Sequence, residues 1–284
     1  MAGISYDSST SYLSIERPYV PGAADIRKHV ELQLPRHADE GYHNGKPRSA
    51  LRSRAHSYFH SNIAEDTTLD RELYILAFAT GIQDVATFPD YHCFASNQTG
   101  NTVLLAAGVL GIGGDGFSLL IIGLSLLFFI AGAGIFGQLG NLLGVRQRWW
   151  LLSTSAVQTI MVFVTAALQY HYGTVDGAPT AKVIIALLAM SSGAQVAMVR
   201  SLKVTEVTTA MATAAYIDIL IDPKILARKN YSRNRRVFFL SSLVAGSFAG
   251  AGIYKRMGSA CALLVSAIGK LIVVGLLFLN RTQL

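Results

Sequence analysis

Residues 117–140 read FSLLIIGLSLLFFIAGAGIFGQLG, and residues 149–170 read WWLLSTSAVQTIMVFVTAALQY. Neither stretch contains a charged side chain. Each is long enough for a helix to cross a hydrocarbon core of about 30 Å, which takes roughly 17–25 residues. A surface helix of a soluble protein would show a polar face with a period of about 3.6 residues, and these stretches lack one. They therefore predict transmembrane helices, since a helix satisfies its own backbone polar groups in lipid.

Further apolar stretches follow the same pattern on both sides of these two. The clear ones are 73–90, 183–199, 237–254 and 257–279. Two others, 94–114 and 204–221, are interrupted by polar side chains. Apolar runs of about 10–14 residues are more often re-entrant or broken than spanning. The sequence thus predicts an all-α polytopic membrane bundle with about six spanning helices and two short or broken ones, and eight crossings is the alternative.

Composition divides the chain into two parts. Hydrophobic residues make up 51% of it and charged residues 14%, against about a quarter charged in globular chains. Residues 1–70 are polar and predict a mostly disordered tail, while 71–284 form the membrane domain. Six basic residues lie within 224–236, between apolar stretches. Such a cluster orients a membrane protein and meets lipid headgroups, so we expect it on the cytoplasmic side. The expected localisation is integral and multi-pass, with the lipid bilayer and not nucleic acid as partner.

The membrane domain resembles two copies of one unit, 71–171 and 179–282. The sequence Gly-Ile-Gln at 81–83 matches Gly-Ala-Gln at 193–195. Further along, AGAGIF at 131–136 matches AGAGIY at 249–254. If each unit crosses the membrane an odd number of times, the two units are inverted repeats.

Small residues recur at i, i+4, a spacing that lets helices approach closely in lipid. The pairs are Ala133/Gly137, Gly140/Gly144 and Gly246/Gly250. These faces are candidates for contacts between helices of one chain and between copies of the chain.

Polar side chains inside the apolar stretches, above all in the two interrupted ones, are candidates for a solute path. Transporters built from repeats place their sites near the membrane midplane, on broken helices in equivalent positions of the two halves. The candidates are Gln83, Asp84, Asn97, Gln98, Thr99, Asn101, Thr102, Gln195, Thr205, Glu206, Thr208 and Thr209.

Asp84 is the strongest single candidate, because an acid within a membrane segment is costly to keep. It is expected to carry a proton or cation, or to contact a substrate. The alternative is a structural ion pair, with Lys270 or Arg200 as the partner.

Metal and cofactor chemistry have little support in the sequence. Asp218 and Asp222 are spaced i, i+4 and are able in principle to hold Mg²⁺, but Asp222-Pro223 also predicts a plain helix end. Only His92 and His171 fall in the membrane domain, so histidine-box iron chemistry is excluded. No metal site, catalytic residue or cofactor is predicted.

The stretch 79–111 resembles the YoaK-like family of multi-pass membrane proteins, a family known by a domain of unknown function. The shared features are Gly81, Asp84 and Val85 in the first helix and Thr99-Gly100-Asn101 opening the next. The resemblance extends over about residues 70–280. It implies a polytopic membrane fold and brings no activity with it.

From the residues, the expected function is a transporter or channel for a small polar solute or ion. One alternative is a membrane-embedded enzyme that acts on a lipid or isoprenoid-like substrate, with Asp84, Glu206 and Asp218 as acid/base candidates. A second alternative is a scaffold that assembles partners in the membrane. An enzyme is the less expected of the first two.

Overall fold

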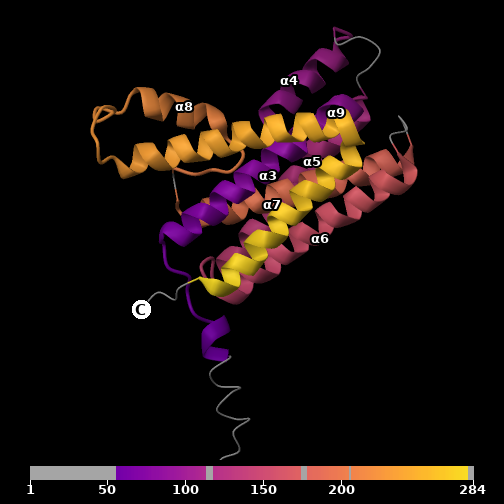
Figure 1. Ribbon diagram of the computed structural model, residues 1–284. Helices are drawn as coiled ribbons and strands as arrows, with labels where there is room; N and C mark the ends of the chain where they lie inside the picture. Colours follow the sequence, from indigo (N-terminus) through magenta and orange to yellow (C-terminus); the bar gives the residue numbers. More distant parts are fainter. Residues whose placement is uncertain (1–55, 113–117, 174–177, 205, 281–284) are drawn as a thin grey trace, which may run out of the picture. The chain divides into compact units, whose positions relative to one another are not determined.

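The computed structural model describes residues 56–112, 118–173, 178–204 and 206–280, and the named elements within them are all helices (Figure 1). They are α3 (Thr67–Tyr91), α4 (Gln98–Val109), α5 (Leu119–Leu143), α6 (Arg148–Tyr172), α7 (Pro179–Ser201), α8 (Ala212–Leu220) and α9 (Tyr231–Leu279). α9 is interrupted at Gly258, whose φ of 84° lies in the left-handed region open to glycine. The predicted all-α class is confirmed for the described part of the chain.

Helix length separates the elements into two groups. α5, α6, α7 and α9 are long and apolar enough to cross a membrane. α3 has 25 residues, as α5 does, but it carries acidic side chains at Asp70, Glu72 and Asp84 that lower its apolar character. α4 and α8 have only 12 and 9 residues. At about 1.5 Å per residue, neither reaches across a bilayer, as the interruptions in their sequences predicted.

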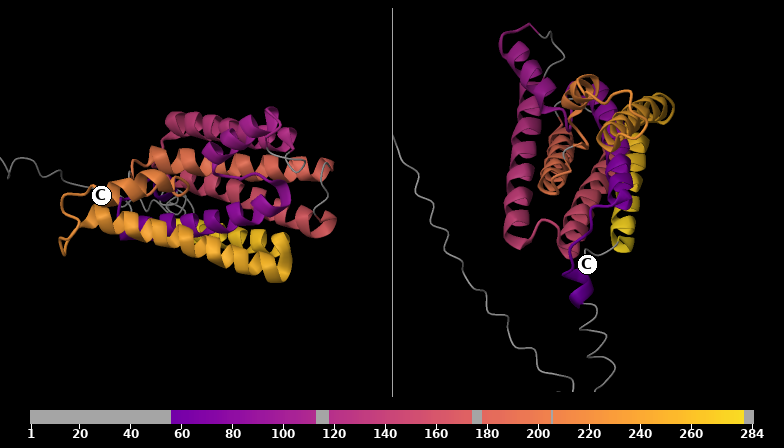
Figure 2. Two further views of the ribbon diagram at one scale, coloured as in Figure 1. Left: turned by 90° about the horizontal axis from the view of Figure 1, so that it is seen from above. Right: turned by 90° about the vertical axis from the view of Figure 1, so that its left-hand side faces the viewer.

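Helices from distant parts of the chain pack along one another (Figures 1 and 2). α3 lies along α9, and α5 lies along α7. α6 packs against both α7 and α9. The short helices pack elsewhere: α4 against α5, and α8 against α9. Each short helix is therefore held by the long helix that follows it in the chain.

Glycines permit the closest helix approaches. Gly193 of α7 faces the α5 backbone, where an added Cβ would overlap the carbonyl oxygen of Phe129. Gly81 of α3 faces the α9 backbone in the same way, at the carbonyl oxygen of Leu243. Small residues at such points let backbones approach in lipid, where packing and not hydrophobic burial favours association.

Most of the predicted small-residue pairs are used inside the chain. Gly246 and Gly250 meet the α3 backbone, and Gly137 lies beside α7. Gly140 faces Trp150 of α6, while Gly144, with a φ of 96°, ends α5. Because internal neighbours already occupy these faces, the expectation that they join copies of the chain is not supported.

Residues ahead of α3 belong to the packed structure. The Ile63 side chain is 1% exposed, and its N–H donates to the carbonyl of Arg146 (3.0 Å). Asp66 caps α3 by accepting hydrogen bonds from the backbone N–H groups of Thr68 and Leu69. The packed structure therefore includes residues that precede α3. The part of the predicted tail at 1–55 lies outside the described residues.

Arg148, the first residue of α6, joins its helix to the segment before α3 and to the end of α9. Its side chain is 0% exposed and donates to the carbonyl oxygens of Asn280 (2.7 Å) and Phe278 (3.2 Å). It also donates to the hydroxyl of Tyr58 (2.8 Å). The last carbonyls of a helix lack intrahelical partners, so a cation here stabilises the end of α9.

Candidate functional site

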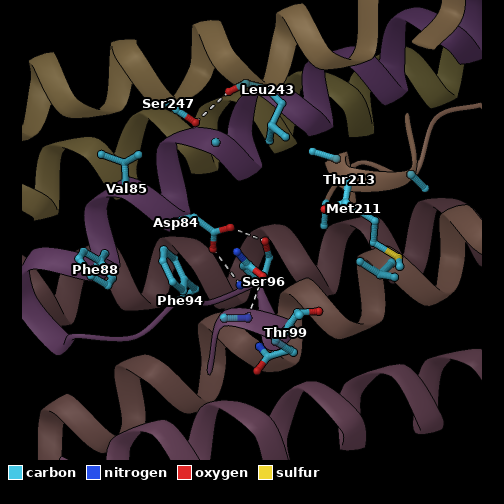
Figure 3. Close-up of a pocket in the computed structure, with 18 of the residues that line it drawn as sticks. Asp84, Val85, Phe88, Phe94, Ser96, Thr99, Met211, Thr213, Leu243 and Ser247 are labelled. Atoms are coloured by element: carbon cyan, nitrogen blue, oxygen red, sulfur yellow. Dashed lines mark hydrogen bonds between the residues drawn. The ribbon is translucent and has the colours of Figure 1, made fainter. Parts of the chain in front are cut away.

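A cavity of about 1280 Å³ lies between α3, α4, α8 and the first half of α9 (Figure 3). Phe129 of α5 and Val196 of α7 complete its wall. Most of the wall is apolar, and its polar side chains are Asp84, Ser96, Asn97, Gln98, Thr99, Thr213, Asp218 and Ser247. Four residues predicted for the solute path, Asp84 and 97–99, therefore meet at one cavity.

Both short helices begin at this cavity. α4 contributes its first residues, 98–100, and α8 contributes 212–214 together with its N-cap residue Met211. The first turn of an α-helix carries backbone N–H groups that have no intrahelical partner. In α4 the Asn97 side chain accepts one of them, from Gly100 (3.2 Å). The side chain of Met211, the N-cap residue of α8, accepts no hydrogen bond from the first turn of the helix, so this turn meets the cavity without a capping side chain.

Asp84 reaches the cavity from α3, opposite the loop that leads into α4 (Figure 3). One carboxylate oxygen accepts from the backbone N–H of Ser96 (2.8 Å), and the other accepts from the Ser96 hydroxyl (2.5 Å). Both donors are neutral. Among the described residues Asp84 forms no ion pair. The carboxylate thus fastens the loop to α3 and presents its negative charge at the cavity wall.

Asn101 and Thr102 lie behind this wall. The Asn101 side chain is buried and binds both backbone groups of Phe94, donating to its carbonyl (2.7 Å) and accepting from its N–H (2.8 Å). The Thr102 hydroxyl donates to the carbonyl of Gln98 (2.8 Å). These two residues shape the loop and the first turn of α4, and they do not line the cavity as the sequence interpretation expected.

Gln83 and Gln195 hold α3 against α7. The amide of Gln83 donates to the Ser192 hydroxyl (2.9 Å), and the amide of Gln195 donates to the Thr80 hydroxyl (3.0 Å). Both glutamines are buried. They lie at the contact between the two helices and outside the cavity lining.

The alternative interpretation of Asp84, an ion pair with Lys270, has no counterpart among the ion pairs of the described residues. Lys270 is 2% exposed, and its ammonium group donates to the Gln195 carbonyl oxygen (2.7 Å) and the Ser191 hydroxyl (3.2 Å). The two side chains are directed to different neighbours: Lys270 toward α7, and Asp84 toward the loop before α4. Neutral hydrogen-bond partners therefore satisfy both charged groups.

The second-half candidates set up the turn into α8. Thr205 lies outside the described residues. Glu206 pairs with Arg235 (3.3 Å), and the Thr208 hydroxyl donates to the carbonyl of the α8 N-cap residue (2.9 Å). Thr209 is buried, with a φ of 57°. None of the last three lines the cavity, so the second half contributes the start of α8 and not these side chains.

The two carboxylates considered for Mg²⁺ have separate partners. Asp218 lines the cavity and lies 3.4 Å from the Nε atom of Arg236. Asp222 accepts from the Asn230 amide (2.8 Å) and the Lys224 N–H (2.8 Å), and these hydrogen bonds lower the pKa of its carboxyl. Within the part of the chain that the structure describes, no cluster of three metal-ligand side chains occurs.

Several cavity residues were not singled out from the sequence. Ser96 directly precedes the polar run at 97–102, which was the available signal. Phe88 follows Asp84 by one helical turn and so shares its face of α3. Met211 reaches the cavity only because of the turn into α8, and no local sequence pattern indicates that turn.

Comparison with protein families places the cavity inside a recognised domain. A family model described as "Protein of unknown function (DUF1275)" matches residues 73–276. The matched range extends from the second turn of α3 almost to the end of α9, and it includes all the cavity-lining residues. No curated protein and no solved structure matches the chain.

Proposed function

The chain belongs to this family of proteins of unknown function, DUF1275, and we propose that it is a membrane transporter or channel for a small polar solute or ion. The observation that carries the proposal is that Asp84 and the first turns of α4 and α8 bound a single cavity. Broken helices that begin at a shared site are a recurring feature of transporters. An ionisable side chain within a membrane domain commonly marks a substrate or ion path.

Six crossings are proposed: α3, α5, α6, α7 and the two parts of α9, 231–257 and 259–279. Contacts between helix ends support this count. Arg146, just after α5, lies 3.3 Å from Glu65, just ahead of α3. Two crossings return the chain to the side on which it started, and three do not. The short helix α4 therefore does not add a crossing between these two residues.

The remaining helix ends are consistent with the same arrangement. Arg146 also donates to the carbonyl of Leu202, at the end of α7 (2.7 Å). At the opposite end, Asp90 near the end of α3 accepts from Tyr254 (2.6 Å), which lies shortly before the break in α9, and from Gln169 near the end of α6 (3.2 Å). The basic segment 224–236 leads into α9 and includes its first turns, so we place this end in the cytoplasm.

The two halves of the domain are proposed to be inverted repeats, each with three crossings. The hydrogen bonds from Gln83 to Ser192 and from Gln195 to Thr80 support this proposal. In each helix the donor glutamine lies three residues after the Ser or Thr that accepts from the other helix. A reciprocal contact of this kind is what a two-fold axis through two equivalent helices produces. The long helices pack in the same reciprocal way. The first helix of each half lies on a helix of the other half, α3 on α9 and α7 on α5.

The enzyme alternative has less structural support. It requires Asp84, Glu206 and Asp218 to act at one site. Asp84 and Asp218 line the cavity, whereas Glu206 is paired with Arg235 (3.3 Å) and does not. The acids are therefore divided between two environments.

Uptake by proteoliposomes that contain the purified full-length protein tests the proposed function. The solutes offered are radiolabelled amines, amino acids, polyols and monovalent cations. We expect saturable uptake of at least one class. Thr213→Trp places a large side chain at the cavity and is expected to abolish that uptake. Tyr216→Trp is the matched control, because Tyr216 is exposed on the same helix and does not line the cavity.

Other results would favour the alternatives. Absence of uptake for every class, together with turnover of an added lipid or isoprenoid-like substrate that Thr213→Trp blocks, would support the enzyme. Absence of both activities in folded protein would support the scaffold.

A further inference from the structure

The charged groups of the cavity are few and of one sign. Of the described residues that line it, only Asp84 and Asp218 are charged. Asp218 lies 3.4 Å from the Arg236 guanidinium, so its charge is compensated from outside the cavity. The Asp84 carboxylate accepts hydrogen bonds from neutral groups, among them the N–H and the hydroxyl of Ser96. The lining thus presents one carboxylate that no described cation compensates.

The wall beside this carboxylate is aromatic. Phe88 and Phe94 stack on each other, with ring centroids 4.9 Å apart and an interplanar angle of 18°. Both lie on the Asp84 side of the cavity, and Met211 lies across from them (Figure 3). Ring faces carry partial negative charge and attract cations, above all in places shielded from water. Carboxylate and rings therefore favour the same sign of ligand.

The remaining wall has the character of a site for an organic molecule. It is built from aliphatic and aromatic side chains that include Val85, Val103, Phe129, Val196, Ile217 and Leu243. A volume of about 1280 Å³ exceeds what a single inorganic ion fills, since pockets of about 300–1,000 Å³ hold drug-sized ligands. These apolar side chains also form no hydrogen bonds with the water molecules that surround a hydrated inorganic ion.

We propose that the cavity takes an amphiphilic organic cation, a protonated amine attached to an apolar body, with its ammonium group at Asp84 and its body against the Phe88–Phe94 pair. This assignment rests on the proposed transport function and names the substrate class of that site.

The helix starts are compatible with a cationic ligand. A helix N-terminus favours negative charge, and at α4 that charge is supplied by the protein. The Asp84 carboxylate accepts the N–H of Ser96, two residues ahead of Gln98, where α4 begins. An anionic ligand would meet this uncompensated carboxylate and no described lining cation. The α8 start remains available for a neutral acceptor on the ligand, such as a hydroxyl or ether oxygen.

Three probes of nearly equal shape test the assignment: 2-phenylethylamine, 2-phenylethanol and 3-phenylpropanoate. Binding to the purified full-length protein is measured by calorimetry at neutral pH. We expect the amine to bind about tenfold or more tightly than the alcohol, and the propanoate to bind least, because interactions with a charged partner are the stronger ones. Equal binding of amine and alcohol, or tighter binding of the propanoate, would overturn the cation assignment.

Two variants locate the binding. Asp84→Asn should remove the preference for amine over alcohol while leaving weak binding of the alcohol, which shows that the cavity is still formed. Thr213→Trp should remove binding of both probes, and Tyr216→Trp should remove neither. An amine preference that persists in Asp84→Asn would place the cation elsewhere and contradict the assignment.

Uptake separates this assignment from the transport function on which it rests. Amine binding that depends on Asp84, without amine uptake in proteoliposomes, would support the ligand class and contradict transport. Uptake of the propanoate that Thr213→Trp blocks would support transport through the cavity and contradict the ligand class.

Discussion

The carbonyl oxygen of the Gln195 side chain lies 2.7 Å from the ammonium nitrogen of Lys270, and both residues are buried. A buried cation is costly in a membrane domain unless it is hydrogen-bonded or paired. Here the partners are neutral, Gln195 and Ser191. In the described structure Lys270 is therefore independent of Asp84, and this independence leads to a measurable expectation.

We predict no energetic coupling between Asp84 and Lys270. In a double-mutant cycle of Asp84→Asn and Lys270→Met, the effects on the free energy of unfolding should add to within about 0.5 kcal/mol, as for residues that share no partners. Unfolding of the detergent-purified variants by urea or heat provides the measurement. A coupling of more than about 1 kcal/mol would restore the ion pair that the sequence suggested.

Asp84→Asn is expected to lower solute uptake by about tenfold or more, because an interaction with a charged group contributes about 1.5–3 kcal/mol. The Tm should change little, since the Asn side-chain oxygen is still able to accept the N–H of Ser96. Uptake in proteoliposomes and the Tm are measured on the same preparation. Full uptake by a stable Asp84→Asn protein would remove the carboxylate from the mechanism.

Gly193→Ala should destabilise the protein by about 1–3 kcal/mol, the usual cost of overpacking. The new Cβ would overlap the carbonyl oxygen of Phe129, a backbone atom that is not able to move alone. Gly134→Ala is the matched control, since a Cβ there meets open space. Its effect should stay within about 0.5 kcal/mol. Equal stability of the two variants would contradict the close approach of α5 and α7.

At the start of α9, substitution of Arg235 should lower the stability of the protein far more than substitution of its neighbour Arg236. Arg235→Met leaves the buried carboxylate of Asp70, now 2.5 Å from the guanidinium, without its cation. Loss of one partner of a buried pair costs about 3–5 kcal/mol. Arg236→Met breaks only the contact with Asp218, whose side chain is 43% exposed, and should cost about 0–1 kcal/mol. Comparable Tm losses for the two variants would contradict this difference.

The count of crossings is open to direct chemical labelling. In a background without Cys93 and Cys261, Tyr172→Cys at the exposed end of α6 should react with a membrane-impermeant thiol reagent on intact cells. Six crossings place Tyr172 outside, and eight place it inside. Leu226→Cys, in the basic segment and 93% exposed, should react only after the membrane is opened. Protection of Tyr172→Cys until that step would favour eight crossings.

The long helices were predictable because unbroken apolar stretches have few other solutions in lipid. Asp84 and residues 97–99 were predictable for the related reason that polar groups in such stretches are costly. The orientation of each helix was not. A helix that is apolar on all sides has no sequence period to show which face meets a neighbour, so Gln83 and Asp84, adjacent in sequence, were both assigned to the solute path although only Asp84 lines the cavity.

The hydrogen-bond partners of polar side chains were likewise not predictable from the sequence. Thr208 and Asn101 look like ligands in the sequence, but their hydrogen bonds go to nearby backbone groups. Glu206 was assigned to the solute path because its pairing with Arg235 depends on the fold and is not visible in the sequence. Polar groups that bond to the backbone or form long-range charge pairs are not free to bind a ligand. Composition alone does not reveal which polar groups are left for that role.

Arg148 gives the chain an order of assembly. Its hydrogen bonds go to Tyr58, made well before it, and to the carbonyls of Phe278 and Asn280, made long after it. Both carbonyls follow α7, α8 and nearly all of α9 in the chain, so during synthesis the guanidinium lacks these two partners until α9 is almost complete. Only the arrival of the last helical turn allows it to be buried. The carbonyls of Phe278 and Asn280 are the last of these partners to be made, so the end of α9 completes the hydrogen bonding of Arg148.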